Sequence, residues 1–449
     1  MNSGKIVVIG GDAGGMGAAS KIRREQPHRQ IVVFERGYHT SYAACGIPYY
    51  IGGQVESSEH LIARKPDVFI EKQNIDVRIR HEVLEIDTDK KKVKVENLDK
   101  GITFWESWDD LLLATGASAI VPDLPGVDTR GVFALSTLQS GIEVFEYMEK
   151  FKPEKAVIVG AGYIGIEMAE ALQARGMDVS VVDMADQVMN SMDKDMAIYI
   201  GEYMKGEGIH LYLEEKLNHI KSDAAGGVST VVTDKRSLDA DIVILGLGVK
   251  PNSELASNTV IQLGVGGAIR VNKRLETTLP NVWAAGDCAE SFHLLKKEQV
   301  HVPLGTVANK HALVAGINIS GGKAEFPGVL GTAITKFKDL EISRTGLSDK
   351  EASALGIPFH SNIIESSVFS SYYPGADKIH VKLNVEKDSG RLLGGQIVGM
   401  KTAAKRIDTI ATAITTGMTA QDLANLDLSY APPFSPVWDP VQTAARTLL

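Results

Sequence analysis

Two stretches, KIVVIGGDAGGMGAASKIRR at residues 5–24 and KAVIVGAGYIGIEMAEALQARG at residues 155–176, decide the fold. Each reads as a β-branched apolar strand, a glycine turn and a helix of small and apolar residues. Each is followed by a short strand that ends in an acid, QIVVFE at Glu35 and VSVVD at Asp183. One glycine motif is a weak signal, but two in this context predict two nucleotide-binding βαβ units.

The rest of the chain predicts further strands around these units. The stretch 83–96 predicts a β-hairpin, and 108–118, 240–252 and 281–290 each predict a buried strand that ends in a turn. From about residue 326 the pattern predicts antiparallel strands, followed by a helix over 403–417 and a short Pro-rich segment. The expected fold is α/β, with two Rossmann-like dinucleotide-binding domains and a C-terminal α+β domain.

Composition limits the function classes. The chain has 449 residues and a net charge of −9, which argues against a nucleic-acid partner. No apolar run approaches the ~20 residues of a membrane span, and the N-terminus lacks a signal-peptide pattern. Its two cysteines, Cys45 and Cys288, form neither a disulfide framework nor a metal site. Low cysteine use fits a reducing compartment, so we expect a cytoplasmic protein.

The second glycine loop matches the G-x-G-x-x-G pattern at Gly160, Gly162 and Gly165. The first glycine allows a tight turn, the second lets backbone approach a pyrophosphate, and the third lets helix and strand pack closely. The helix N-terminus then offers free N–H groups to the phosphates. This loop is predicted to bind a dinucleotide.

The first loop departs from the pattern. Gly10 and Gly15 match, but Asp12 occupies the middle position. A carboxylate there repels a pyrophosphate unless it points away, and Gly14 supplies compensating backbone freedom. Glu35 can accept a hydrogen bond from a ribose hydroxyl, so dinucleotide binding is still the prediction.

Asp183 bears on the choice between NADH and NADPH. A carboxylate accepts a hydrogen bond from the 2′-hydroxyl of NADH and repels the 2′-phosphate of NADPH. No arginine follows in the sequence VVDMADQ. We therefore expect NADH, with NADPH as the alternative.

With the ATG turn at residues 114–116 and the string AAGDCAE around Asp287, these motifs resemble the pyridine nucleotide–disulfide oxidoreductase flavoproteins over essentially the whole chain. The resemblance implies FAD in the first loop and NAD(P)H in the second. It implies that Thr115 and Gly116 contact the cofactor, that Asp287 binds the flavin ribitol chain, and that Tyr163 shields the flavin. From the residues alone, the alternative is that Asp287 caps a helix.

The resemblance also gives the domain ranges. It implies an FAD-binding domain over 1–121 and 246–325, an NAD(P)H-binding domain over 122–245, and a dimerisation domain over 326–449. The chain is then expected to be a homodimer.

The cysteine pattern narrows the branch of the family. Glutathione and lipoamide reductases carry a C-x-x-x-x-C pair, whereas here Cys45 stands alone and Tyr50 occupies the second position. The strings ACGIPYY, SSYYPGA and YAPP resemble coenzyme A disulfide reductases and NAD(P)H sulfur or polysulfide reductases. By that resemblance Tyr372 and Tyr430 reach the partner's Cys45 site.

Cys45 is the expected redox centre, because a thiolate attacks sulfur. Pro48 tolerates a first-turn position, so a helix is expected to begin here and to lower the pKa of Cys45 below the free value of ~8.5. The alternative is a buried, inert cysteine, which is the expectation for Cys288. Tyr430 is a candidate proton donor to the departing thiolate, or simply an interface tyrosine.

A coenzyme A substrate needs cations for its phosphates. By the resemblance, Arg24 and Arg64 are candidates, although a basic helix face is usually only solvated. Ser41 and Tyr42, next to Cys45, are expected to contact the substrate.

Three functions remain open. The first is an enzyme that uses NAD(P)H and FAD to reduce coenzyme A disulfide, coenzyme A persulfide or polysulfide through Cys45. The second is an NADH oxidase or peroxidase in which Cys45 becomes a sulfenic acid. The third is a non-catalytic redox-sensing flavoprotein.

Overall fold

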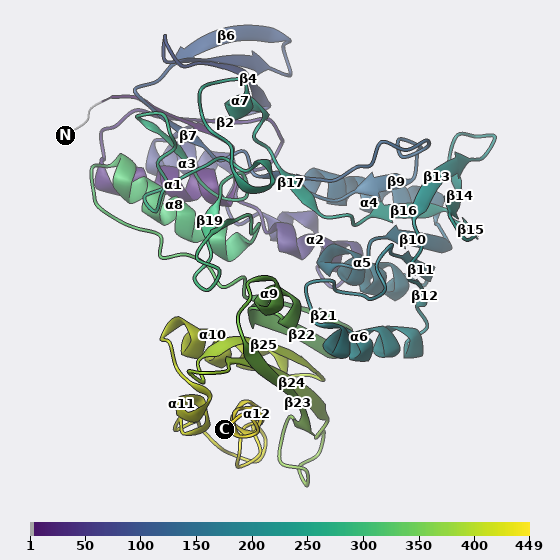
Figure 1. The fold of residues 1–449 in the computed structure, drawn as a ribbon. Helices are drawn as coiled ribbons and strands as arrows, with labels where there is room; N and C mark the ends of the chain where they lie inside the picture. The colour runs from purple at the N-terminus through teal and green to yellow at the C-terminus, as the bar shows by residue number, and fades with distance from the viewer. Residues whose placement is uncertain (1–3) are drawn as a thin grey trace.

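The computed structural model describes residues 4–449 and folds them into three units, each built on a five-stranded sheet (Figure 1). Two of these sheets are parallel and the third is antiparallel. The predicted α/β architecture with a C-terminal α+β unit is confirmed. The exact domain boundaries stay a prediction.

The first unit contains the N-terminal glycine loop. Its sheet has the strand order β18-β7-β1-β2-β3. The strands are β18 (Val282–Ala284), β7 (Asp110–Leu113), β1 (Ile6–Ile9), β2 (Ile31–Glu35) and β3 (Asp76–Ile79). Every residue of β1 is buried, as expected for a central parallel strand that is covered on both faces.

Helix α1 (Ala13–Glu25) packs against α8 (Gly305–Ile319), and α3 (Pro66–Gln73) precedes β3. An antiparallel sheet of β4 (His81–Asp87), β5 (Lys92–Asn97) and β6 (Ile102–Ser107) is attached to this unit. The hairpin predicted over 83–96 is confirmed as β4 and β5.

The second unit repeats the plan around the second glycine loop, with the order β12-β11-β10-β16-β9. The strands are β12 (His210–Tyr212), β11 (Asp178–Val182), β10 (Lys155–Val159), β16 (Ile242–Leu245) and β9 (Val132–Ala134). Its helices are α4 (Leu138–Phe151), α5 (Tyr163–Ala174) and α6 (Lys194–Gly206). A small antiparallel sheet of β13 (Leu217–Ser222), β14 (Val228–Thr233) and β15 (Ser237–Asp239) completes the unit.

The chain crosses between the first two units twice. The two crossings pair with each other as the antiparallel strands β8 (Ala117–Ala119) and β17 (Val249–Pro251). The short elements after them are α7 (Glu254–Ser257), β19 (Ser291–Phe292) and β20 (Gln299–Val300).

The third unit is an antiparallel sheet in the order β21-β22-β25-β24-β23, drawn green to yellow in Figure 1. The strands are β21 (Ala333–Phe337), β22 (Leu340–Gly346), β25 (Leu392–Gly399), β24 (Lys378–Glu386) and β23 (Phe359–Ser367). The helices are α9 (Asp349–Ala354), α10 (Ile407–Thr415), α11 (Ala420–Ala424) and α12 (Pro440–Arg446). The predicted helix over 403–417 is confirmed, in a shorter form.

A buried lysine joins the second and third units. Lys382 on β24 is 1% exposed. Its Nζ atom lies 2.6 Å from Asp349, 2.7 Å from Asp195 and 3.0 Å from Asp193. Asp193 and Asp195 flank the start of α6, and Asp349 begins α9. Because a buried charge is costly unless it is paired, this cluster favours one placement of α6 on the third unit.

Candidate functional site

Both glycine loops have the same backbone geometry. Gly10 and Gly160 lie at φ angles of 110° and 109°, a region that L side chains rarely adopt. A Cβ atom on Gly15 would lie 1.9 Å from the carbonyl oxygen of Gly10, and one on Gly165 would lie 1.9 Å from that of Gly160. The structure therefore requires glycine at the first and third positions of each loop.

The middle positions differ. A Cβ atom on Gly162 would meet nothing within 4 Å, so the space before the N-terminus of α5 is open. In the first loop the Asp12 carboxylate is turned aside, and its Oδ1 atom accepts a hydrogen bond from the backbone amide of Tyr42 at 3.1 Å. Burial, with the nearby carboxyls of Glu35 and Asp287, raises the pKa of Asp12 to about 6. The carboxylate thus has a partner within the protein.

The acid at the end of β2 and the acid directly after β11 hold their glycine loops in the same way. Glu35 accepts from the amide of Gly11 at 2.7 Å and from that of Gly37 at 2.6 Å. Asp183 accepts from the amide of Ala161 at 2.7 Å and from that of Ala185 at 2.8 Å. Each carboxylate is only partly buried and retains lone pairs for a further donor.

The ATG turn is anchored by Asn252. The side-chain amide of Asn252 donates to the Thr115 carbonyl at 2.8 Å, and its backbone amide donates to the Gly116 carbonyl at 2.9 Å. The Thr115 hydroxyl donates to the carbonyl of Asn252. The turn is therefore rigid. Asn252 was not among the predicted site residues, although it lies in the predicted strand segment 240–252.

Asp287 lies in a turn after β18, at a left-handed Gly286. The next helix, α8, begins only at Gly305, so the reading of Asp287 as a helix cap is wrong. Its Oδ1 atom is buried and has no hydrogen-bond partner among residues 4–449. Burial raises the pKa of this carboxyl, while His301 opposes the effect. A buried acceptor without a partner fits a cofactor hydroxyl.

These observations fit two dinucleotides. In the first unit, the Gly10–Gly15 loop, Glu35 and the unpartnered Asp287 oxygen suit a flavin dinucleotide. In the second, the open loop at Gly162 and the Asp183 carboxylate suit a nicotinamide dinucleotide.

Cys45 lies in a short 3₁₀ turn, Ala44–Gly46, that leads directly into α2 (Ile47–Ile51). Pro48 lies in the first turn of α2, so the predicted helix start is confirmed. The Cys45 side chain is exposed, whereas Cys288 is fully buried with its sulfur against the carbonyls of Leu113 and Ala285. Of the two thiols, only that of Cys45 is open to a substrate.

The expected lowering of the Cys45 pKa is wrong. Desolvation by the surrounding protein raises it, and the carboxyls of Glu167, Asp287 and Asp12 add to the effect. Helix α2 has only five residues and supplies little dipole to oppose them. In this environment the thiol favours its protonated form.

Glu167 is a site residue that the sequence reasoning missed. It lies on α5, one turn after Tyr163, and accepts a hydrogen bond from the Thr335 hydroxyl at 2.7 Å. Burial raises the pKas of Glu167 and of Tyr163, which is the first residue of α5. Glu167 is one of two acids in the otherwise apolar helical string YIGIEMAE, and such acids were the available signal.

The tyrosines predicted to act in the site lie away from Cys45 of the same chain. Tyr372 and Tyr430 are 74% and 46% exposed. Their segments are joined by a bond from the Ser370 amide to the Pro432 carbonyl at 3.2 Å. A hydrogen bond with Tyr430 raises the pKa of Tyr372. The loop between β23 and β24 lies at the end of the third unit farthest from α2 (Figure 1).

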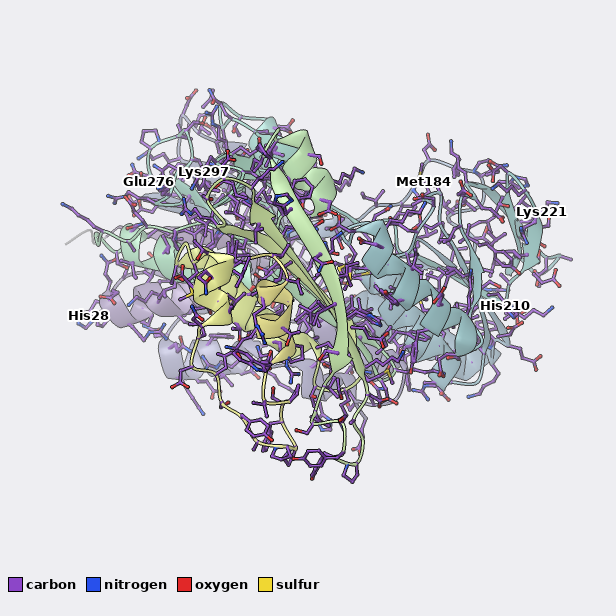
Figure 2. The ribbon with its side chains drawn as sticks, turned by 60° about the horizontal axis from the view of Figure 1, so that its bottom comes forward. His28, Met184, His210, Lys221, Glu276 and Lys297 are labelled. Carbon is purple, nitrogen blue, oxygen red and sulfur yellow. The ribbon has the colours of Figure 1, made fainter. Side chains whose placement is uncertain are left out.

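The predicted substrate residues separate into two groups. Ser41 and Tyr42 lie in residues 41–45, which we call the Cys45 segment. Arg64 follows the stretch 61–63, which pairs with this segment. Arg24 is exposed in the last turn of α1, at the opposite end of that helix from the glycine loop. The nearby His28 lies at the outer edge of the first unit in Figure 2. A substrate that contacts both groups must be long.

The NAD(P)H side of the site opens to the surface. Met184, directly after Asp183, is 73% exposed and lies at the surface of the second unit (Figure 2). A nucleotide ribose can therefore approach Asp183 from solvent.

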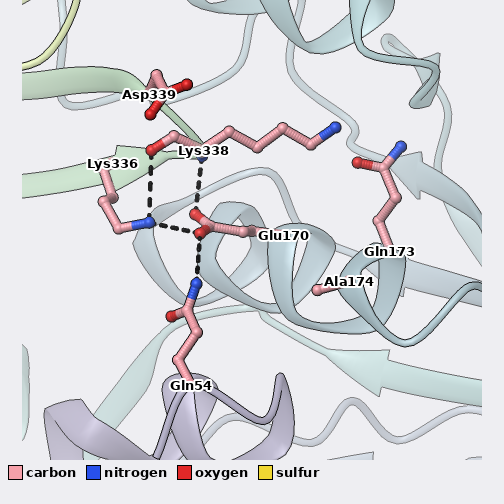
Figure 3. Close-up of a pocket in the computed structure, with 7 residues that line it drawn as sticks. All are labelled: Gln54, Glu170, Gln173, Ala174, Lys336, Lys338 and Asp339. Carbon is pink, nitrogen blue, oxygen red and sulfur yellow. Dashed lines mark hydrogen bonds and ion pairs between the residues drawn. The ribbon is translucent and has the colours of Figure 1, made fainter.

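A separate pocket of about 360 Å³ lies where the three units meet (Figure 3). It is lined by Gln54, Glu170, Gln173, Ala174, Lys336, Lys338 and Asp339. Glu170 accepts from the Gln54 side chain at 3.2 Å and from the Lys338 amide at 2.8 Å, and it pairs with Lys336. None of the predicted site residues lines this pocket. Through these contacts Glu170 connects the three units.

Among the described residues, no helix is long and apolar enough to span a bilayer. Within the same range, no group of three or more His, Cys, Asp or Glu side chains is arranged to hold a metal ion.

Two family models match this chain, one over the first two units and one over the third unit. Residues 4–312 match the family described as pyridine nucleotide-disulphide oxidoreductase, and residues 332–440 match its dimerisation domain. A solved NAD-dependent persulfide reductase from A. fulgidus superimposes with a TM-score of 0.95 at 40% identity, over 99% of this chain and 82% of the other.

Three relatives match nearly the whole chain. An NAD(P)H coenzyme A polysulfide/persulfide reductase of Pyrococcus horikoshii is 42% identical over 99% of this chain and 98% of its own. An NADH oxidase of Methanocaldococcus jannaschii is 37% identical over 99% and 98%. A coenzyme A disulfide reductase of Staphylococcus epidermidis is 32% identical over 96% of both chains.

Proposed function

Because the chain belongs to the pyridine nucleotide-disulphide oxidoreductase family, we propose that it uses NAD(P)H and FAD to reduce coenzyme A disulfide, coenzyme A persulfide or polysulfide through Cys45. The observation that carries this proposal is the place of Cys45. Its thiol is exposed, and its segment is hydrogen-bonded through Tyr42 to Asp12 of the first glycine loop, Gly10–Gly15, which we call the flavin loop.

Each of the two glycine loops would bind one of the two cofactors. The loop of Gly10, Gly14 and Gly15, with Glu35, the ATG turn and Asp287, would hold FAD. The loop of Gly160, Gly162 and Gly165, with Asp183, would hold NADH, and Tyr163 lies at the start of the adjoining helix. When bound, the pair of cofactors supplies a hydride and delivers two electrons to sulfur.

The protein's own chemistry is a thiol–disulfide exchange. The Cys45 thiolate attacks one sulfur of coenzyme A disulfide, which forms a Cys45–coenzyme A mixed disulfide and releases the first coenzyme A thiolate. Two electrons then cleave the mixed disulfide, which restores the Cys45 thiolate and releases the second coenzyme A. One NADH and one proton are consumed for each disulfide.

The dimer supplies the remaining groups. The chain is a homodimer, in line with its match to the dimerisation domain. Tyr372 and Tyr430 are exposed and lie far from Cys45 of their own chain, so we assign them to the partner's site. There a phenol can donate a hydrogen bond to the departing thiolate.

The long coenzyme A chain fits the separation of the basic residues. Ser41 and Tyr42 would contact the substrate near its sulfur, Arg64 lies beside their segment, and Arg24 would meet a phosphate farther away. The two free cysteines and the low cysteine count support a cytoplasmic location.

A second candidate is oxidase or peroxidase chemistry. It is favoured by the exposure of Cys45, which lets peroxide reach the sulfur and form a sulfenic acid, and by the relative that is an NADH oxidase.

Mass spectrometry of the purified, unreduced protein separates these alternatives. A coenzyme A adduct on Cys45 supports disulfide exchange with coenzyme A. A mass increase of one oxygen on Cys45 would favour the oxidase, provided that the enzyme oxidises NADH as fast with oxygen as with coenzyme A disulfide. An unmodified Cys45 together with bound FAD and no disulfide turnover would point to a non-catalytic sensor.

A further inference from the structure

Asp12 does not act as the helix cap that its position suggests. It is the N-cap residue of α1, but its side chain caps no amide of that helix. Its Oδ1 atom instead accepts the Tyr42 amide at 3.1 Å. The next amide back along the chain, that of Ser41, donates to the carbonyl of Gly11 at 3.1 Å. Two consecutive amides of the Cys45 segment are thus bound by two consecutive residues of the flavin loop.

The same segment is held from its other side. The Ser41 carbonyl accepts from the Ala63 amide at 2.8 Å, and the Ala43 amide donates to the Leu61 carbonyl at 2.8 Å. Ser41 has a left-handed φ of 48°, which costs energy for a non-glycine residue. Contacts from both sides therefore hold the strained backbone at Ser41 in place. Cys45 follows four residues later.

The loop does not need a side chain at this position in order to form. The equivalent residue of the second loop is Gly162, and that loop has the same glycine geometry. The second loop also has no cysteine segment beside it. The Asp12 carboxylate is thus an addition to the loop, and its Oδ1 atom is hydrogen-bonded to the segment that leads to Cys45.

The charge of Asp12 also acts at the redox centre. Its surroundings include the titratable groups Glu35, Asp287, Tyr42 and Cys45. Burial is the main cause of the raised pKa of Asp12, and Glu35 and Asp287 add to it, while the amides of Tyr42 and Ala13 favour the carboxylate. Asp12 in turn contributes to the raised pKa of Cys45.

We propose that Asp12 is a positioning residue of the redox centre, whose carboxylate ties the flavin loop to the segment that carries Cys45. The hydrogen bond to Tyr42 fixes the place of the thiol, and the negative charge restrains its ionisation. The functional part rests on Cys45 being the redox cysteine.

Two variants separate the hydrogen bond from the charge. Asp12→Asn keeps an oxygen acceptor for Tyr42 and removes the charge, whereas Asp12→Ala removes both. Glu71→Gln, an exposed acid on α3, is the matched control for loss of one charge. All variants are prepared as holoenzyme, and their FAD content is checked by absorbance.

The first measurement is hydrogen exchange, followed by mass spectrometry, of the peptide that contains residues 41–45. The Tyr42 amide should stay protected in the parent, in Asp12→Asn and in Glu71→Gln, and exchange faster in Asp12→Ala. Equal protection in Asp12→Ala and the parent would overturn the proposal. This readout is independent of turnover, so it decides the structural role even if Cys45 proves not to be the redox centre.

The second measurement is kinetic. In Asp12→Ala, kcat with coenzyme A disulfide should fall about tenfold, the scale of a lost hydrogen bond to a charged group, while flavin reduction by NADH stays unchanged. Asp12→Asn should keep kcat near the parent value and alkylate Cys45 faster with iodoacetamide at neutral pH. If Asp12→Asn loses as much kcat as Asp12→Ala, or leaves the alkylation rate unchanged, the proposed division of roles is wrong.

Discussion

The Oδ2 atom of Asp183 accepts a hydrogen bond from the backbone amide of Ala161 at 2.7 Å, so the acid directly after β11 is fixed against the second glycine turn. Its other oxygen accepts from Ala185. Because both bonds come from backbone, the carboxylate is already placed before a nucleotide arrives. This pre-organisation favours recognition of the adenosine ribose hydroxyls.

Replacing Asp183 by Ala should weaken NADH binding by about 1.5–3 kcal/mol, or roughly tenfold to a hundredfold in Kd. It should also reduce the discrimination against NADPH, because the carboxylate that repels a 2′-phosphate is gone. Stopped-flow reduction of the flavin with each nucleotide measures both effects. Asp186→Ala is the control, because this exposed acid on the same loop pairs with Lys194 and not with the glycine turn. A parent enzyme that strongly prefers NADPH would refute this reading of Asp183.

Replacing Glu167 by Gln should lower the pKa of Cys45. Among the neighbouring charges, that of Glu167 contributes most to the raised pKa of Cys45. Loss of that charge therefore stabilises the thiolate. The pH dependence of Cys45 alkylation in the holoenzyme should therefore move to lower pH. Glu71→Gln again controls for a remote charge. An unchanged profile would mean that Glu167 does not act on the thiol.

Replacing Arg24 by Ala should raise KM for coenzyme A disulfide and leave KM for NADH unchanged. The arginine is exposed and far along α1, so its contribution should be a phosphate contact that weakens with added salt. A small disulfide without phosphates should be reduced equally by both proteins. Arg23 is a poor control, because its side chain donates to the Pro27 and Asn74 carbonyls. A variant with parental KM values at every salt concentration would remove Arg24 from the site.

A complementation experiment tests whether the tyrosines act in the partner's site. A Cys45→Ser chain is mixed with a chain that carries both Tyr372→Phe and Tyr430→Phe, and the subunits are allowed to exchange. The heterodimer then holds one site with both defects and one with neither. For random exchange, activity should return to about a quarter of the parental value, as two-fold symmetry requires. Confirmed exchange without recovered activity would place the tyrosines elsewhere.

Much of this fold could be predicted from local patterns. The turns at Gly10 and Gly160 demand glycine for steric reasons that act within a few residues, and each glycine loop is followed by its acid at the end of the next strand. Antiparallel strands and the C-terminal helix likewise carry their own periodicity. Such features need no knowledge of distant contacts.

The electrostatics of the redox centre could not be predicted in this way. The pKa of Cys45 depends on Glu167, Asp287 and Asp12, which come from three separate segments. Sequence reasoning considered only the helix that follows the cysteine, and therefore predicted the wrong sign. Local patterns likewise do not predict that Asp12 turns towards Tyr42, because this depends on how the Cys45 segment passes the glycine loop.

The most direct measurement is the turnover of Cys45→Ser with NADH and coenzyme A disulfide, compared with its bound FAD and its rate of flavin reduction. The serine hydroxyl cannot form the mixed disulfide, so we predict full FAD content, near-parental flavin reduction by NADH, and no disulfide reduction. A Cys45→Ser enzyme that reduces coenzyme A disulfide at a rate near the parent's would contradict the assignment of Cys45 as the redox centre.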